Sequence, residues 1–150
     1  MSSHIFTCLG IVFALSACAG RQGAARPAVD RALGCYVVRT DVDSNQRGWF
    51  PDTIALLSSR SKDGPVENTY RVRLTERQAR RMSLLSFGWR NVGADSLEIV
   101  GSSGFFGVEF KGRFTADGFE GSAASFTDVI GPDPVPRYPV AATRARCLGF

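Results

Sequence analysis

The sequence predicts an all-β fold: a small antiparallel up-and-down barrel of about eight strands, with a β-sandwich as the alternative. Three observations favour it. Apolar and polar residues alternate with a period of two along residues 84–128, no segment between the strands has the pattern of a crossover helix, and two cysteines lie near the two ends of the folded part.

The stretch 84–128 contains four apolar runs separated by Gly, Asp and Ser. In the third run the apolar residues share one parity and the charged residues take the other, so one face of the strand is buried. The apolar set is Phe106, Val108, Phe110 and Phe114. The pair Asp117-Gly118 predicts a two-residue type I′ turn, in which both central residues have positive φ. The stretch is therefore expected to be a four-stranded meander.

Three further strands are expected before this meander and one after it, at residues 34–40, 50–59, 68–75 and 140–148. Residues 76–83 break the alternation and favour a short helical turn. The total is eight strands.

The N-terminal segment has the form of an export signal. Residues 5–17 form an apolar run too short to span a bilayer, and the run ends in small residues. Its last residues and the next, Leu15-Ser16-Ala17-Cys18, resemble the lipobox of bacterial lipoproteins. The resemblance implies cleavage before Cys18 and diacylation of Cys18. It also implies a place in the bacterial cell envelope, with the domain in the periplasm or at the surface. The alternative is an ordinary signal peptide cut near Ala19.

These features divide the chain into three parts. Residues 1–17 are the lipoprotein signal peptide, residues 18–32 are the lipidated Cys and a flexible tether, and residues 33–150 are the β-barrel domain. The tether is inferred because its sequence is small, polar and contains Pro. No acidic residue stands directly after Cys18, so the protein is expected at the outer membrane rather than at the inner membrane.

Two cysteines, Cys35 and Cys147, remain in the folded domain. Export places them in an oxidising compartment, where an isolated pair forms a disulfide. The alternative is two thiols that hold a metal, which is poorly supported because the chain after Cys18 contains no His. A disulfide would bring the first strand next to the last, as in a closed barrel or in a sandwich with adjacent termini.

This pattern resembles the lipocalin-like, or calycin, barrels. Their first strand opens with a G-x-W signature, and their last strand carries an Arg that packs over the Trp ring. Gly34-Cys35-Tyr36 is the counterpart of the first signature, with Tyr in place of Trp, and either Arg144 or Arg146 is the counterpart of the Arg. The resemblance implies an interior that is filled by side chains or holds one small ligand.

Residue types exclude several chemistries. The single His, His4, lies in the predicted signal, so the mature chain has no imidazole for Ser-His, Cys-His or His-metal sites. Asp41 and Asp43 lie in a turn-rich loop without the later Gly and Glu of an EF-hand, so a solvated turn is expected. The Gly-rich residues 101–104 lack the Lys-Ser/Thr of a P-loop and are interpreted as a hairpin turn. We expect no enzyme, no cofactor and no metal.

The formal net charge of +4 comes from 18 Lys and Arg against 14 Asp and Glu. The basic residues are scattered, so nucleic acid is not an expected partner. The charge suits an anionic envelope component such as lipid headgroups. A local patch of Arg77, Arg80 and Arg81 would meet such a headgroup, with a solvated face as the alternative.

Seven aromatic residues at strand spacing are predicted to line the interior and to form any ligand site. They are Tyr36, Tyr70, Phe87, Trp89, Phe106, Phe110 and Phe114. The main functional hypothesis is a membrane-anchored envelope lipoprotein whose barrel binds or carries a small hydrophobic ligand. The alternative is a structural or interaction lipoprotein with a filled barrel and no small-molecule site.

Overall fold

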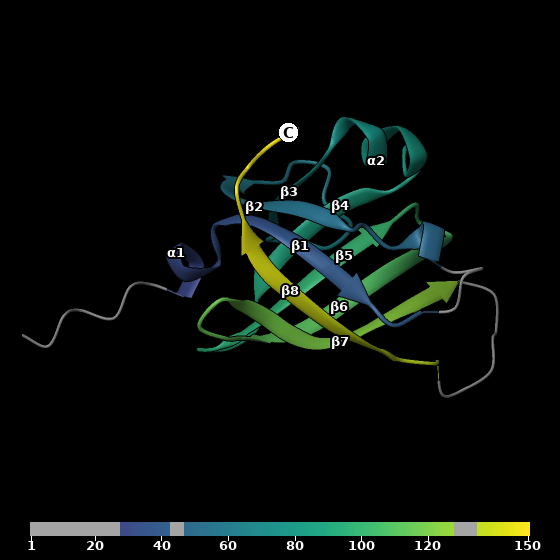
Figure 1. The fold of residues 1–150 in the computed structure, drawn as a ribbon. Helices are drawn as coiled ribbons and strands as arrows, with labels where there is room; N and C mark the ends of the chain where they lie inside the picture. Colours follow the sequence, from purple (N-terminus) through teal and green to yellow (C-terminus); the bar gives the residue numbers. More distant parts are fainter. Residues whose placement is uncertain (1–27, 43–46, 128–134) are drawn as a thin grey trace, which may run out of the picture.

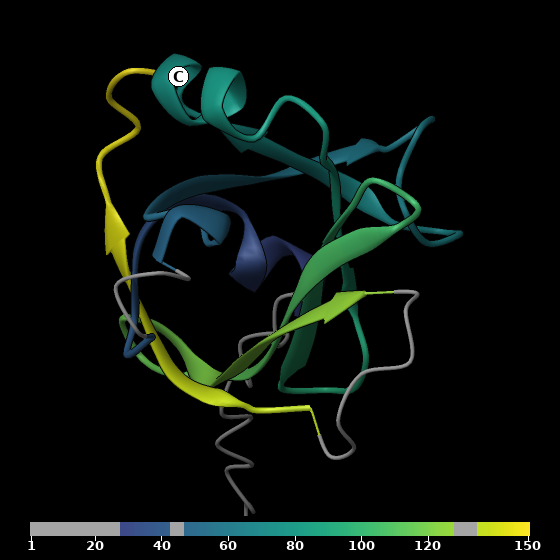
Figure 2. The same cartoon turned by 90° about the vertical axis from the view of Figure 1, so that its right-hand side faces the viewer.

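A computed structural model describes residues 28–42, 47–127 and 135–150 of the chain. Eight antiparallel strands each pair with the next in sequence, and the last pairs with the first to close a barrel (Figures 1 and 2). The predicted all-β up-and-down barrel is confirmed, and the sandwich is excluded.

The strands follow the predicted order. They are β1 (Gly34–Thr40), β2 (Thr53–Arg60), β3 (Tyr70–Leu74), β4 (Ser86–Asn91), β5 (Ser96–Ser102), β6 (Phe106–Phe114), β7 (Gly118–Thr127) and β8 (Tyr138–Ala145). Strand β2 begins three residues later than expected, because Arg47–Trp49 forms a 3₁₀ turn, η1, and Pro51 has no N–H for a ladder.

The predicted helical turn is helix α2 (Glu76–Arg81), between β3 and β4. Thr75 caps it: its hydroxyl oxygen accepts a hydrogen bond from the backbone N–H of Gln78.

The up-and-down order gives the barrel two different ends. The connections after β1, β3, β5 and β7 all lie at one end, which we name the mouth, and η1 and α2 belong to it. The connections after β2, β4 and β6 lie at the other end, the base, together with helix α1 (Ala28–Ala32) (Figure 1).

Helix α1 corrects the expected boundary of the tether, because residues 28–32 had been assigned to a flexible segment. Ala32 is fully buried, and Val29 and Leu33 pack against the core. Asp95 fixes the helix to the β4–β5 turn through an ion pair with Arg31, at 2.7 Å. This short helix is held by tertiary contacts at the base. The predicted signal peptide, Cys18 and residues 19–27 lie outside the described residues.

The β6–β7 hairpin forms where it was predicted, but its turn is different. The backbone N–H of Thr115 donates to the carbonyl of Gly118, so the two central residues are Ala116 and Asp117. Neither Asp117 nor Gly118 has positive φ. Gly118 is required for space: a Cβ there would overlap the carbonyl oxygen of Ala142 on β8. The predicted type I′ turn at Asp117-Gly118 is therefore wrong, although the hairpin is right.

The structure joins Cys35 to Cys147, as predicted, with the two Cα atoms 5.3 Å apart. Cys35 lies on β1 and Cys147 follows β8, so the bond reinforces the seam where the barrel closes.

Candidate functional site

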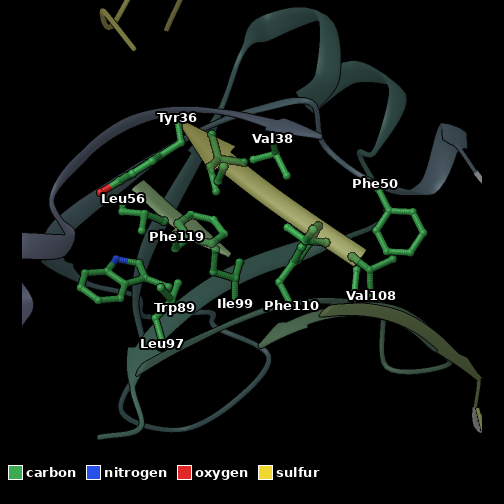
Figure 3. Packing of buried hydrophobic residues seen from close by; sticks show 14 of the residues in the cluster. Tyr36, Val38, Phe50, Leu56, Trp89, Leu97, Ile99, Val108, Phe110 and Phe119 are labelled. Carbon is green, nitrogen blue, oxygen red and sulfur yellow. The ribbon is translucent and has the colours of Figure 1, made fainter. Parts of the chain in front are cut away.

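The interior of the barrel is packed with side chains. Trp89, Tyr36 and Ile99 have no exposed surface, and Phe110 is 2% exposed. Rings contact one another across the interior: Tyr36 meets Phe119 with centroids 5.3 Å apart (Figure 3). Eight strands enclose a space that side chains just fill.

Most of the predicted aromatic set belongs to this core. Of the seven, Tyr36, Phe87, Trp89 and Phe110 are buried. Tyr70 and Phe114 are partly buried and pack against the same core, and Tyr70 stacks on Trp89 at 4.9 Å. Phe106 stands apart, because it lies near the mouth and contacts Trp49 at 5.1 Å. The structure thus brings six of the seven residues into the core and places the seventh near the mouth.

The base is closed by Arg144, one of the two candidates for the Arg of the barrel signature. Its guanidinium lies 5.4 Å from the centre of the Tyr36 ring. It donates hydrogen bonds to the backbone carbonyls of Leu33, at 2.8 Å, and Arg31. Tyr36 donates from its hydroxyl to the carbonyl of Ala32 at 2.8 Å. These groups lock helix α1 onto the first strand.

The backbone geometry at the start of β1 explains why the signature has a glycine, Gly34, at its first position. Gly34 has a φ of +137°, a backbone conformation that residues with a Cβ rarely adopt. A Cβ there would also lie 2.9 Å from Nη1 of Arg144. Burial raises the pKa of Tyr36, and the charge of Arg144 opposes that rise. The Tyr36 hydroxyl therefore remains a neutral donor to α1 at neutral pH.

At the mouth, Phe50 covers the interior. Its ring packs edge-on against Phe110, with centroids 5.7 Å apart, and also contacts Tyr138. Figure 3 shows Phe50 at the end of the core opposite Tyr36 and Trp89. Phe50 is 2% exposed.

Next to this cover lies a small apolar hollow of about 210 Å³. Its lining is mainly apolar, with one guanidinium. The lining residues are Gly48, Trp49, Arg81, Met82, Leu84, Leu85 and Phe106. Pockets that take a drug-sized ligand have volumes of roughly 300–1,000 Å³, whereas an apolar cavity of about 150 Å³ holds a benzene. The hollow is therefore large enough for a molecule of about the size of benzene or for part of a larger apolar molecule.

The outer wall carries a network of charges that the sequence did not reveal. Glu98 on β5 is only 5% exposed, because Arg90 on β4 and Lys111 on β6 pair with it at 2.5 and 3.5 Å. Lys111 also pairs with Glu109 at 2.7 Å, and Arg137 pairs with Glu109 at 3.2 Å. The strand register places Arg90, Glu98 and Lys111 in one row.

Two opposing effects act on Glu109. Burial alone would raise its pKa, but the hydrogen bond and charge of Lys111 and the hydrogen bond from Arg137 outweigh it and lower that pKa. The hydrogen bond that Lys111 donates to Glu109 likewise raises the pKa of Lys111. Both carboxylates of the network pair with basic groups, so the network joins strands and offers no free acid–base pair.

A shallow open groove of about 660 Å³ lies on the same wall, across β5 to β8. Five of its eleven lining residues are charged or polar, including Lys111, Arg113, Glu120 and Ser122. Because the groove is open to solvent, it does not enclose a ligand as a small-molecule site does.

Within residues 28–42, 47–127 and 135–150, no three His, Cys, Asp or Glu side chains gather as a metal-binding group. Asp41 is exposed, and Asp43 lies outside the described residues. Residues 101–104 end β5 and enter the β5–β6 turn, where Gly104 has a φ of +92°, so the predicted hairpin turn is confirmed. None of the helices in the described part of the chain is long and apolar enough to cross a membrane.

Sequence reasoning missed the exposed apolar residues of the mouth. Trp49, Leu84 and Phe105 are 42%, 73% and 77% exposed, and they come from three different connections. Each directly precedes another large apolar residue in the sequence, so the sequence does not distinguish the exposed residue from its buried or half-buried neighbour. For Phe105 there was a signal, because its parity in the strand is opposite to that of Phe106.

Known proteins add no further guide. Comparison with models of protein families, with curated proteins and with solved structures finds no match.

Proposed function

We propose that this chain is a lipid-anchored protein of the bacterial envelope that acts through its surface, with a barrel filled by its own side chains. The observation that carries the proposal is the packed interior: Tyr36, Trp89 and Ile99 have no exposed surface. A carrier barrel needs an internal volume of several hundred Å³. The anchor is inferred from the lipobox at Cys18.

The contacts at both ends support a filled and rigid barrel. Arg144 and Tyr36 fix α1 over the base, and Phe50 covers the mouth. Ligand entry would require the Phe50 ring to leave its contacts with Phe110 and Tyr138, which would expose apolar surface at a cost of about 1.5–3 kcal/mol.

Native mass spectrometry of the chain purified from its bacterial host tests the filled barrel. We expect the mass of the chain alone, after allowing for acyl groups at Cys18. A stoichiometric hydrophobic molecule that survives removal of detergent would refute the proposal.

The anchor is tested separately by cell fractionation. The Cys18→Ala variant is expected to leave the membrane fraction, whereas a Cys8→Ala variant, altered within the predicted signal, keeps the lipobox and should stay. Continued pelleting of Cys18→Ala with membranes would refute lipidation.

The second candidate function is binding of a small hydrophobic ligand at the mouth. The hollow of about 210 Å³ favours it, because it is apolar and Arg81 stands at its edge. A fluorescent fatty acid should then bind, and Leu85→Trp, which fills the hollow, should abolish that binding. If the probe binds equally to both chains, it does not use the hollow.

A further inference from the structure

We propose that the mouth of the barrel docks on a bilayer surface that contains anionic lipids. The docking groups are an apolar rim, defined as Trp49, Leu84 and Phe105, and the arginines of helix α2. The inference deepens the proposed function by naming the partner of the surface. It rests on that function only for the location in the envelope.

The rim is a product of the topology. Trp49 ends η1 between β1 and β2, Leu84 lies between α2 and β4, and Phe105 lies between β5 and β6. All three connections are at the mouth (Figure 1). Three large apolar residues that are distant in sequence therefore belong to one end of the molecule. They are 42%, 73% and 77% exposed.

The rim borders the hollow. Trp49 and Leu84 line it together with Met82, Leu85 and Phe106, and Phe105 precedes Phe106 on the chain. The volume of about 210 Å³ accepts part of one acyl chain and is too small for a complete lipid. Apolar side chains beside such a hollow match the outer part of a bilayer, where aromatic residues are enriched.

Positive charge lies next to the rim. Helix α2 carries Arg77, Arg80 and Arg81 against one carboxylate, Glu76. Arg80 and Glu76 are 3.9 Å apart and highly exposed, so their pairing has little strength. Within the described part of the chain, Arg77 and Arg81 have no ion-pair partner. Arg81 also lines the hollow, so a cation and an apolar surface meet at one place.

This combination favours a bilayer over a protein partner. Apolar groups inserted at the headgroup boundary, with basic groups at headgroup level, are the usual means by which proteins lie on anionic membranes. Each basic side chain near such a surface strengthens binding by about fivefold. A protein interface would instead need an apolar area larger than three separate side chains supply.

The test uses a chain that starts at Ala19 and therefore lacks Cys18. The sheet closes on itself and every described contact lies within residues 28–150, so this chain keeps its whole core. It is mixed with vesicles of phosphatidylcholine alone, or with phosphatidylglycerol added. Co-sedimentation measures binding, and tryptophan quenching by brominated lipid measures insertion. Trp89 is fully buried, so quenching reports Trp49.

We expect binding to the anionic vesicles that weakens with salt, together with quenching of Trp49. The Arg80→Gln/Arg81→Gln variant should bind about thirtyfold more weakly. Its matched control is Arg113→Gln/Arg146→Gln, which removes the same charge from exposed positions toward the base. Vesicles of phosphatidylcholine alone should bind far less of the chain.

The rim is tested by Leu84→Ser/Phe105→Ser, which should weaken binding at least tenfold. Its control is Val37→Ser/Val92→Ser, which alters two residues that are 41% and 50% exposed, on β1 and in the β4–β5 connection, outside the connections of the mouth. Absence of binding to anionic vesicles, or equal losses from the rim variant and its control, would overturn the proposal. Because the chain tested has no Cys18, failure of the predicted anchor does not affect this result.

Discussion

Replacing Arg144 by Ala tests how the base of the barrel is closed. The guanidinium donates to the carbonyls of Leu33 and Arg31 and lies 5.4 Å from the centre of the Tyr36 ring. The variant loses all three interactions at once, and helix α1 loses its principal link to β8.

The magnitude follows from the contacts. A hydrogen bond from a charged donor contributes roughly 1.5–3 kcal/mol, and the exposure of Arg144 favours the lower value for each bond. A cation over an aromatic ring adds about 0.5 kcal/mol at an exposed site. Arg144→Ala should therefore reduce the free energy of unfolding by about 3.5 kcal/mol. Arg144→Lys should recover less than half, since an ammonium group cannot reach both carbonyls in the fork geometry of Arg.

Urea unfolding followed by circular dichroism measures this loss. Arg146→Ala is the matched control, because Arg146 is exposed, carries the same charge and makes no described contact of its side chain with α1. Its effect should stay within about 0.5 kcal/mol. A loss below about 1 kcal/mol for Arg144→Ala, or equal losses for both variants, would refute the assigned role of Arg144.

The contact between Arg144 and Tyr36 also predicts that the free energy of unfolding decreases at alkaline pH. The pKa of Tyr36 is raised by burial, so the stability it contributes is complete below the unfolded pKa of about 10 and is lost as pH rises toward the folded value. Arg144 opposes the rise, so Arg144→Ala should raise the pKa of Tyr36 further and steepen the loss above pH 10.

Three other predictions follow from the fold. Reduction of the Cys35–Cys147 bond, whose cysteines are 112 residues apart, should lower the free energy of unfolding by roughly 5 kcal/mol, measured by urea unfolding with and without reductant. Gly118→Ala should cost about 2 kcal/mol or more in thermal and urea unfolding because its Cβ meets the backbone of β8, whereas Gly48→Ala, with open space around it, should change stability by less than about 1 kcal/mol. The pKa of Glu109 is lowered, so the stability that its carboxylate contributes should be present at pH 7 and should be lost as the pH falls below the unfolded pKa of about 4.3 and through the lower folded pKa. Glu109→Gln should make the free energy of unfolding depend less on pH in this acid range. An unchanged dependence in urea unfolding would contradict the prediction.

The strands were predictable because their signal is local. In β6, Val108 and Phe110 alternate with charged residues, and one buried face produces that pattern whatever lies opposite. Closure was predictable from Cys35 and Cys147, because a covalent bond between the ends of the domain restricts the topology. The helix at residues 28–32 was not predictable, because five residues are too few to show a helical period in the sequence. The helix is held by Arg144 and Asp95.

The other features that the sequence did not predict depend on contacts between residues of different strands. Gly118 signals a turn in the sequence, yet it is needed for close packing against β8. Glu98 lies between two core residues, and only the register shows that Arg90 and Lys111 flank it. Whether a ligand site exists depended on how completely the rings fill the barrel, which alternation cannot specify.

The two ends of the barrel give the proposed anchor a direction. Helix α1 lies at the base, so a tether from Cys18 reaches the molecule at the end opposite the rim (Figure 1). Nine residues separate Cys18 from α1, and this segment spans at most about 35 Å when fully extended. The nine residues of β6 cover about 30 Å along the strand, and tilt reduces the height of the barrel to roughly 20–25 Å. The tether would therefore have to run back along the barrel wall, almost fully extended, to bring the rim to the membrane that holds the anchor. An anchored protein of this shape presents its rim more readily to a second surface, so lipid attachment and rim docking together would join two membranes.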